Sequence, residues 1–330
     1  MATRLNPEAV IESVPNFSEG TDAAKVSQIV SAMKVEGVRL LDWSMDAAHN
    51  RSVVTVAGPP AAVVEGVVRG VVKAAELINL TRQTGVHPRI GAADVVPFVP
   101  VSGISLAECA MLARNAGLEI WRRAQVPVYF YEAAATRPDR INLEDVRRGQ
   151  FEGLRDLAPK DAARRPDVGG PDLHPTAGAS AVGARQFLIA YNLYLDAADS
   201  ATQPAGTVPQ SAQAGIAAAR SIARTIRASA GGIHGVKAIG VMVNGRAQLS
   251  MNITDFRRTP MHSIRAAIDE QARQHGAVVT EAELIGLIPR DAYDPDADWL
   301  REIPGFDPEA KVLERRLEHP LPWPGDLRSS

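Results

Sequence analysis

The sequence has few of the features that mark secreted, membrane or nucleic-acid-binding proteins. Only one of its 330 residues, Cys109, is a cysteine, so no disulfide can form within the chain. No stretch is long and apolar enough to span a membrane, and the first ten residues contain no apolar run typical of a signal peptide. The formal net charge of -2 gives no basic excess of the kind that binds nucleic acids or anionic membranes. We therefore expect a cytoplasmic protein without nucleic-acid or membrane partners.

Motifs for metal and phosphate chemistry are missing as well. The sequence has no cysteine pair, no H-E-x-x-H, no P-loop and no G-x-G-x-x-G that follows a strand. We expect no metal site, and any cofactor must be held in another way. What the chain does have is a hydrophobic content of 45% over 330 residues, enough for a large core in two domains or joined subdomains.

The first half alternates strands and helices in the order βαββαβ. The expected elements are a strand at 11–14, a helix at 22–34, strands at 38–43 and 52–57, a helix from Pro60 to about 80 and a strand at 94–101. A helix at 105–123 follows, in which Ser105 and Glu108 have the spacing of a capping box, and then a strand at 126–131. Cys109 lies within that helix and is expected to pack in the core.

The second half repeats this order. Its expected elements are a strand at 187–195, a helix at 212–229, strands at 236–243 and 247–253, a helix from Pro260 to 275 and a strand at 283–288. Asn244-Gly245 favours a type I′ turn between the two middle strands, and Thr259 is expected to be the N-cap of the second helix. Two copies of the split βαβ arrangement predict an α/β (α+β) fold with two ferredoxin-like subdomains, each a mostly antiparallel or mixed sheet with helices packed on it. We place them at residues 1–185 and 186–330, the second including a C-terminal tail.

Two internal segments show no sustained period. Residues 137–183 are rich in Pro, Gly, Asp and Arg, which inside a compact enzyme is typical of a functional loop. Residues 196–213 have the composition of a flexible surface insertion. A short charged helix at 308–317 and the proline-containing tail are expected to pack over the core or an interface.

Polar residues gather in two stretches near the N-terminus. In the first, Asn16 and Ser18 stand between a strand and a helix, where backbone amides can hold an anion, although capping of the helix is the simpler interpretation. In the second, at 41–51, carboxylate, amide and guanidinium groups fall in the expected loop between two strands. Such groups at strand ends are typical of a site, and a solvated loop explains them nearly as well.

The stretch at 84–100 contains His87, which Gly85 precedes and Pro88 follows. An unperturbed histidine has a pKa of about 6.5, so it can accept and return a proton near neutral pH. Because Arg89 and Asp94 are close by in the sequence, the catalytic and structural interpretations are equally open from the residues alone.

Two more stretches lie further along. Small residues dominate 169–185, so a planar ligand could approach the main chain there, with Arg185 facing a carboxylate. At 250–260, Asn252 and Arg257 lie where a strand leads into a helix, and helix capping with surface charge is the alternative.

Taken in this order, the stretches resemble the glutamate formimidoyltransferase family, which includes the transferase part of formiminotransferase-cyclodeaminase. The resemblance runs from Glu12 to about Leu287. It rests on ESVPNFSEG, HNRSVVTVAGPP, TGVHPRIGAADVVPFVPV, VPVYFYEAA, GPDLHPTAGASAVGAR, QFLIAYN, VKAIGV and SMNITDF.

The resemblance implies a transferase of histidine degradation. Such an enzyme transfers the formimino group from N-formimino-L-glutamate to N5 of tetrahydrofolate, its co-substrate, and releases L-glutamate. It also implies a homodimer, folate between the subdomains, and a separate cyclodeaminase acting downstream. The alternatives are a related donor, formiminoglycine or formylglutamate, and a folate-binding protein without turnover.

The family motif H-P-R-x-G-A places the catalytic histidine on His87. Its carboxylate partner is expected to be Asp42, with Asp46 and Asp94 as alternatives, because Ser44 stands where relatives often have the second Asp of D-x-D. The family's folate-contacting run is one residue shorter in this chain. The implied folate contacts are Gly170, Pro171, Asp172, Leu173, His174, Pro175, Thr176, Ala177, Gly178 and Arg185.

The chemistry of the donor defines what the site must do. Attack of N5 on the amidine carbon forms a tetrahedral species that collapses only when the glutamate nitrogen is protonated, so we expect His87 to remove the N5 proton and to return one to the leaving nitrogen. Arginines are suited to the substrate carboxylates because they bind them bidentately. The expected substrate contacts are Asn16, Ser18, Asn50, Arg51, Arg89 and Asn252, with Arg185 and Arg257 as further candidates for the carboxylates.

Overall fold

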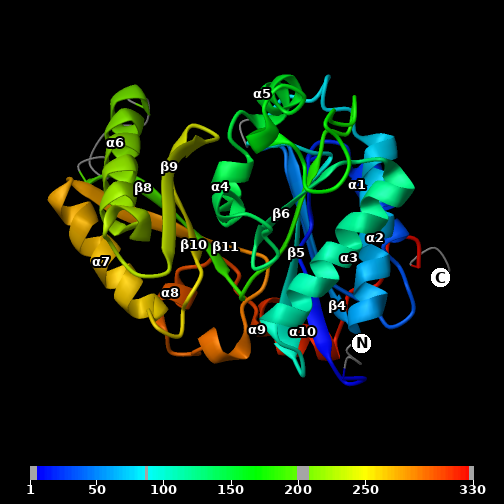
Figure 1. Cartoon of the computed structure of the whole chain (residues 1–330). Coiled ribbons are helices and arrows are strands. Elements are labelled where there is room, and N and C mark those ends of the chain that lie inside the picture. Colours follow the sequence, from blue (N-terminus) through cyan, green and yellow to red (C-terminus); the bar gives the residue numbers. More distant parts are fainter. Residues whose placement is uncertain (1–5, 86–87, 199–207, 327–330) are drawn as a thin grey trace. The chain divides into compact units, whose positions relative to one another are not determined.

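The computed structural model describes residues 6–85, 88–198 and 208–326 of the chain. Contacts divide them into two compact units (Figure 1). The first comprises the described residues up to 186 together with 320–326, and the second comprises those from 187 to 319. Each unit has its own sheet and its own hydrophobic core. The two are described separately below.

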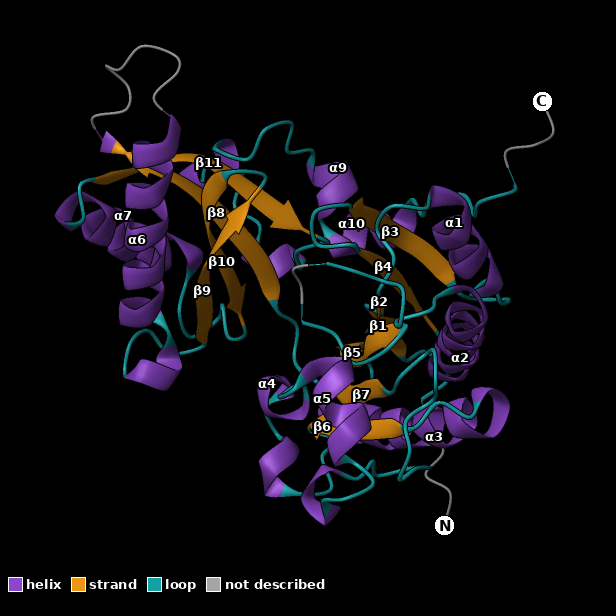
Figure 2. Ribbon diagram, turned by 90° about the horizontal axis from the view of Figure 1, so that it is seen from above, coloured by secondary structure: helices purple, strands orange, loops and turns teal. Residues whose placement is uncertain are grey.

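The first unit contains a seven-stranded mixed sheet, and Figure 2 shows α1, α2 and α3 side by side along one of its faces. The strands are β1 (Val10–Ser13), β2 (Asn16–Phe17), β3 (Arg39–Asp46), β4 (Arg51–Gly58), β5 (Ala93–Ser102), β6 (Val128–Glu132) and β7 (Ser180–Ala184). The helices are α1 (Ala23–Ala32), α2 (Pro60–Leu77), α3 (Leu106–Ala124), α4 (Leu143–Val146) and α5 (Gln150–Leu157), with the short 3-10 helices η1 (Pro138–Arg140) and η2 (Ala162–Arg164). The capping box of Ser105 and Glu108 is confirmed at the start of α3, and Cys109 is fully buried.

The first sheet is built on the predicted split βαβ arrangement. β1 and β2 act as one strand that Pro15 interrupts, since proline has no N–H for the ladder, and both segments pair antiparallel with β4 on one side and β5 on the other. β3 adds antiparallel to β4. The order β3-β4-(β1, β2)-β5 is that of a ferredoxin-like sheet, which confirms the predicted fold class.

Strand β7 was not expected from the sequence, which we interpreted there as a loop of small residues. It lies between β5 and β6 and pairs parallel with both. All five of its residues are buried. Its small side chains are explained by packing, because a Cβ on Gly183 would lie 2.5 Å from the ring of Tyr131.

The second unit is a four-stranded antiparallel sheet in the order β11-β8-β10-β9, again ferredoxin-like. Its strands are β8 (Ile189–Ala197), β9 (Val236–Val243), β10 (Arg246–Ile253) and β11 (Ala277–Ile285). Its helices are α6 (Val208–Ile226), α7 (Met261–Gln274), α8 (Asp298–Arg301), α9 (Pro308–Lys311) and α10 (Leu313–Glu318), with the 3-10 helices η4 (Ala228–Ala230) and η5 (Arg290–Ala292). The predicted hairpin turn is confirmed by the positive φ of Asn244, 50°, and of Gly245, 78°.

Two expectations for this unit were wrong in detail. The last strand begins six residues before the expected Glu283, because a bulge between Val279 and Glu281 breaks its regular alternation. Helix α7 has Pro260 as its N-cap, whereas the Thr259 hydroxyl instead donates to the carbonyl of His234 at 2.9 Å. Half of the expected surface insertion, 199–207, lies outside the described residues.

The C-terminal tail packs over the core of the first unit. The amide of Leu321 donates to the carbonyl of Leu40 in β3 at 2.7 Å, and Trp323 is buried in the first core. Lys34 forms an ion pair with Asp326 at 2.7 Å. The tail therefore covers the outer edge of β3.

Candidate functional site

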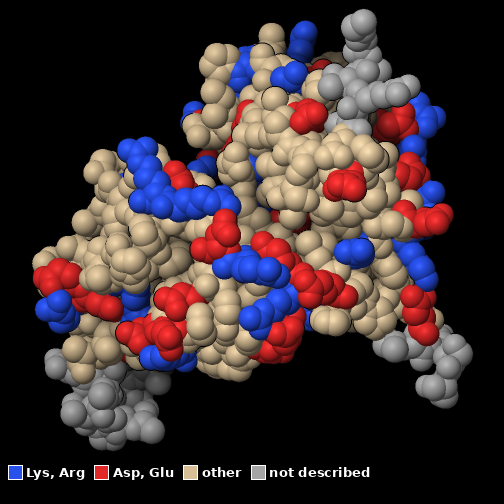
Figure 3. All heavy atoms as spheres, turned by 90° about the horizontal axis from the view of Figure 1, so that it is seen from below, with Lys and Arg blue, Asp and Glu red and all other residues tan. Residues whose placement is uncertain are grey.

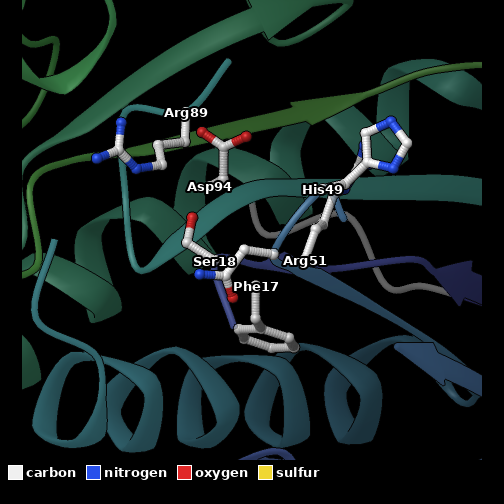
Figure 4. A pocket seen from close by; sticks show the side chains of 7 residues that line it. Phe17, Ser18, His49, Arg51, Arg89 and Asp94 are labelled. Carbon is white, nitrogen blue, oxygen red and sulfur yellow. The ribbon is translucent and has the colours of Figure 1, made fainter. Parts of the chain in front are cut away.

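A small pocket opens in the first unit where three of the polar stretches meet. It is lined by Phe17, Ser18, His49, Asn50, Arg51, Arg89 and Asp94. Figure 4 shows the Ser18, Arg89 and Asp94 side chains on one side of it and His49 on the other, while the Phe17 ring points away toward the helices. These residues come from the end of β2, the turn between β3 and β4, and the segment that leads into β5. The fold thus brings together residues that are up to 77 positions apart, from Phe17 to Asp94.

The turn between β3 and β4 is held by its own polar side chains. The Asp46 carboxylate accepts the backbone N–H of His49 at 3.0 Å and contacts the ring Nδ1 of His49 at 2.6 Å. Burial opposes ionisation of Asp46, but these hydrogen bonds lower the pKa of its carboxyl. The His49 ring is therefore fixed on one side of the pocket by a charged partner.

Asn50 ties three segments of the pocket together. Its backbone adopts a positive φ of 48°, which asparagine tolerates better than most residues. Its Oδ1 accepts from the amide of Gly20 at 2.9 Å, and its Nδ2 donates to the carbonyl of Thr84 at 2.7 Å. Both ends of the side-chain amide are thus bonded to protein, and these bonds shape the pocket. The expected contact of Asn50 with substrate stays a prediction.

Arg51, the first residue of β4, carries the most unusual charge of the pocket. Burial and, after it, the nearby charge of Arg147 lower the pKa of its guanidinium to about 10, while Asp94 and Asp46 act in the opposite direction. The guanidinium is still charged at neutral pH, so Arg51 can bind an anionic group.

Arg89 is only 9% exposed and is occupied by protein groups. Its guanidinium donates to the Glu152 carboxylate at 3.0 Å, to the carbonyl of Gln83 at 3.0 Å, and to the side chain of Gln83. Its own carbonyl accepts the amide of Phe151 at 2.8 Å. Arg89 thus joins the pocket wall to α5, which competes with the expected role of binding a substrate carboxylate.

Asp94 and Ser18 hold the segment that leads into β5. Asp94, 3% exposed, accepts the amide of Ile90 at 2.8 Å through one oxygen and pairs with Arg147 through the other. The Ser18 hydroxyl donates to the carbonyl of Gly91 at 2.7 Å. Ser18 therefore does not cap α1, a role that the side chain of Asp22 fills.

Asn16 lies on β2 and is 6% exposed. Its Nδ2 donates to the carbonyl of Val14 at 2.7 Å, whereas its Oδ1 is buried and meets no hydrogen-bond donor in the described parts of the chain. Asn16 does not cap α1 either. A buried acceptor of this kind is costly unless a ligand or water supplies a donor.

His87 itself lies outside the described residues. The described chain stops at Gly85 and resumes at Pro88. A Cβ on Gly85 would be 2.7 Å from the carbonyl of His49, and Arg89 is in the pocket wall. The catalytic role of His87 stays a prediction.

Of the three carboxylates considered as partners of His87, Asp94 is the one that lines the pocket. Asp42 was expected in the loop between the two strands. It lies within β3 instead, opposite Thr55. The strand continues past its apolar residues to Asp46, because β4 supplies backbone partners along its whole length. Asp42 is therefore four residues away from the turn that carries His49.

The run expected to contact folate forms a tight turn next to the same segment. His174 and Gly178 exchange backbone hydrogen bonds of 2.9 and 3.0 Å, and Nδ1 of His174 accepts the amide of Ala177 at 3.0 Å. Burial lowers the pKa of His174. A Cβ on Gly178 would lie 2.1 Å from the carbonyl of Ile90. The group that lies close to Gly178 is therefore the Ile90 carbonyl, where a planar ligand had been expected.

The other members of the run divide by burial. Leu173 and Ala177 are buried, whereas Pro171 and Asp172 are exposed. Arg185, just after β7, donates its amide to the carbonyl of Phe98 at 3.1 Å and its guanidinium to that of Gln186 at 3.0 Å. None of the expected folate contacts lines the described pocket. The folate contacts stay a prediction.

Asn252 and Arg257 belong to the second unit. Asn252 is an exposed residue of β10, paired in register with Lys237 and Ala190. Arg257 lies over the ring of Phe256 and forms an exposed ion pair with Asp291 at 2.7 Å. The expected contacts of these two residues with substrate also stay predictions.

Sequence reasoning missed Arg147, which pairs with Asp94 from 53 positions away. It lies at the end of α4, in the segment expected to be a functional loop. Nothing in its local sequence distinguishes it from Arg148 beside it, so its role is visible only in the fold.

No group of histidine, cysteine and acidic side chains among the described residues is arranged to hold a metal ion. In the same parts of the chain, no helix is long and apolar enough to cross a membrane. Basic and acidic side chains are interspersed on the face shown in Figure 3. That face carries no large patch of one sign.

Comparison with known proteins identifies the family of the chain. Residues 10–185 match the formiminotransferase domain, N-terminal subdomain, and residues 206–316 match the formiminotransferase domain. The chain is 40% identical to a glutamate formimidoyltransferase of Streptococcus pyogenes, over 93% of this chain and 98% of that protein. It is 37% identical to one of Thermoplasma acidophilum, over 94% and 98%. With the mouse formimidoyltransferase-cyclodeaminase it shares 35% identity over 86% of its own length and 51% of that protein. The chain belongs to the formiminotransferase family.

Proposed function

We propose that this protein is a glutamate formimidoyltransferase, which transfers the formimino group of N-formimino-L-glutamate to N5 of tetrahydrofolate. The products are 5-formiminotetrahydrofolate and L-glutamate, as in histidine degradation. The observation that carries the proposal at the site is the pocket around Arg51. Arg51 lines it together with Arg89, the arginine of the H-P-R-x-G-A motif.

The donor fits such a pocket because it carries two carboxylates. The Arg51 guanidinium in the pocket wall can bind one of them bidentately. Asn16 directly precedes the pocket residues Phe17 and Ser18 in the sequence. Its buried Oδ1 can accept an N–H of the amidine. These two residues are our candidates for orienting the donor.

His87 is our candidate for moving the proton. N5 attacks the amidine carbon, the C–N5 bond forms, and His87 takes the N5 proton. The bond to the glutamate nitrogen then breaks as that nitrogen receives a proton and leaves as a neutral amine. Among the carboxylates, Asp94 is favoured to assist, because it bonds the amide of Ile90 three residues after His87.

The folate co-substrate, the homodimer and the cytoplasmic location belong to this proposal as well. So does a separate cyclodeaminase that would close the ring and release ammonia from the product. Formiminoglycine and formylglutamate are the competing donors. A site that binds the carboxylates of glutamate should reject formiminoglycine strongly, since its own polar groups would be left unpaired.

The experiment is an assay of purified protein with tetrahydrofolate and N-formimino-L-glutamate, which follows 5-formiminotetrahydrofolate. We expect His87→Ala to lower kcat by about 10²–10⁴-fold, the usual contribution of a positioned proton carrier. His275→Ala removes an exposed histidine at the end of α7 and serves as the control, with wild-type turnover expected. Full activity of His87→Ala would contradict the assignment. Folate binding without product would favour a binding protein, and faster transfer from another donor would change the substrate.

A further inference from the structure

The connecting segment 143–157 holds the pocket segment 89–94 at three points. Arg147 pairs with Asp94, the amide of Phe151 donates to the carbonyl of Arg89, and Glu152 pairs with the Arg89 guanidinium. The two ion pairs differ in burial. The side chains of Arg147 and Asp94 are 15% and 4% exposed, whereas Glu152 is 57% exposed. Of the two, the Arg147 pair is therefore the one that solvent screens less.

The Arg147 contact reaches the pocket through Asp94, as the other two do through Arg89. Asp94 lines the pocket and bonds the amide of Ile90, so a displacement of its carboxylate changes both the wall and the chain that follows His87. Without Arg147, the buried carboxylate would lose its cation and would have to move, take up a proton or draw in water. Each of these outcomes weakens its bond to Ile90.

The backbone that carries Arg147 is itself held in place. The guanidinium of Arg164 donates to the carbonyls of Asp145, at 3.1 Å, and Val146, at 3.4 Å, and also to that of Arg148. These are carbonyls at the end of α4, which a four-residue helix cannot satisfy by itself. A long and otherwise flexible arginine is thus presented to Asp94 from a fixed support.

We propose that Arg147 is a positioning residue for the transfer reaction. It acts through Asp94 to hold residues 89–94 and, with them, the chain that carries His87. The inference rests on the proposed function for its kinetic part alone. Arg147 is not a member of the pocket wall, and its effect is expected on kcat more than on the KM for either substrate.

The test compares Arg147→Gln with Arg148→Gln. Arg148 is the next residue, has a side chain 77% exposed and pairs only with Asp145 on its own short helix, so it is a matched control for the loss of one arginine. We expect Arg147→Gln to lower kcat per folded enzyme by about 10²-fold, the effect of a displacement near 1 Å at a reacting group. Arg147→Lys keeps the charge without the planar guanidinium and should fall between the two.

A double substitution tests whether the effect passes through Asp94. Asp94→Asn with Arg147→Gln removes both charges at once and so avoids an uncompensated buried carboxylate if Arg147→Gln alone folds poorly. If Arg147 acts through Asp94, the double variant should be no slower than Asp94→Asn by itself. A further drop by the full factor seen in the single variant would overturn the proposal.

Amide hydrogen exchange gives a readout that does not depend on turnover. We expect faster exchange of residues 88–94 in Arg147→Gln than in Arg148→Gln, because the amide of Ile90 loses its partner. Unchanged exchange, or a kcat equal to that of the control, would overturn the proposal. A wild-type protein that fails to transfer the formimino group would overturn the proposed function alone, and the exchange of residues 88–94 would still decide whether Arg147 holds this segment.

Discussion

The two units share the order βαββαβ, yet they bury different kinds of polar groups. Among the described residues, the buried polar side chains of the second unit are the amides Asn192 and Gln248. Those of the first unit include five charged ones, Glu12, Glu19, Arg89, Asp94 and Arg140. The same topology can therefore support a nearly uncharged interior or a charged one.

The first unit differs from the second by a further segment, residues 137–183, beyond the βαββαβ arrangement that the two share. Buried charges persist in proteins where counter-ions are supplied. In the first unit, residues 137–183 provide Arg147 for Asp94, Glu152 for Arg89 and Asp167 for Arg140, whereas Glu19 pairs with Lys25 of α1. The added segment thus makes a charged pocket possible on a sheet that would otherwise resemble its neighbour.

The largest difference between the two units is expected when an arginine charge is removed from each, at Arg51 in the first. We expect Arg51→Ala to lower kcat/KM for the formimino donor by about 10²-fold, since a charged hydrogen bond contributes roughly 1.5–3 kcal/mol. Arg51→Lys should lose less, because it keeps the charge. Steady-state kinetics with each variant is the measurement, and Arg273→Ala, which removes an arginine 72% exposed in the second unit, is the control. Wild-type kinetics in Arg51→Ala would show that the pocket does not bind the donor.

A second difference is expected in the stability cost of replacing one glycine in each unit. Gly178 and Gly245 have similar φ values, 70° and 78°, but a Cβ on Gly178 would meet the Ile90 carbonyl at 2.1 Å, whereas one on Gly245 meets nothing within 4 Å. Gly245→Ala should cost about 1–2 kcal/mol of unfolding free energy from the backbone conformation alone. Gly178→Ala should cost clearly more, because the pocket segment must also move. Urea unfolding of both variants measures the difference, and equal losses would remove the close approach as its cause.

The smallest effect is expected at an exposed charge of the second unit. Arg257 and Asp291 are 66% and 63% exposed, so their ion pair should contribute less than about 1 kcal/mol to stability. Arg257→Ala is therefore expected to unfold at nearly the wild-type urea concentration. A large loss of stability would mean that the second unit depends on charge as the first does.

Local signals predicted much of the fold. Helix α3 began at the capping box of Ser105, and the turn at Asn244-Gly245 had the predicted left-handed backbone, because such features depend on neighbours in the sequence. Strand β7 was missed because its small residues carry no alternation of apolar and polar side chains, and their burial depends on Tyr131 and on the strands beside them.

The site was predictable only in part, and for a similar reason. Arg51 and Asp94 were among the candidates because charged residues at strand ends are conspicuous. Arg147 resembles any arginine in a polar segment until the fold places it against Asp94. The glycine of the expected folate run, Gly178, has a packing partner in the Ile90 carbonyl that no local pattern could show.

The return of residues 320–326 to the first unit makes the second unit an insertion in sequence. The outer strand β3 gains its last backbone partner, and the first core gains Trp323, from residues that a ribosome makes after the whole second unit. During synthesis, the outer edge of β3 therefore stays incomplete until the second unit has been made. A fragment that stops at residue 186 would keep that defect permanently, and a second chain carrying the tail would be needed to repair it.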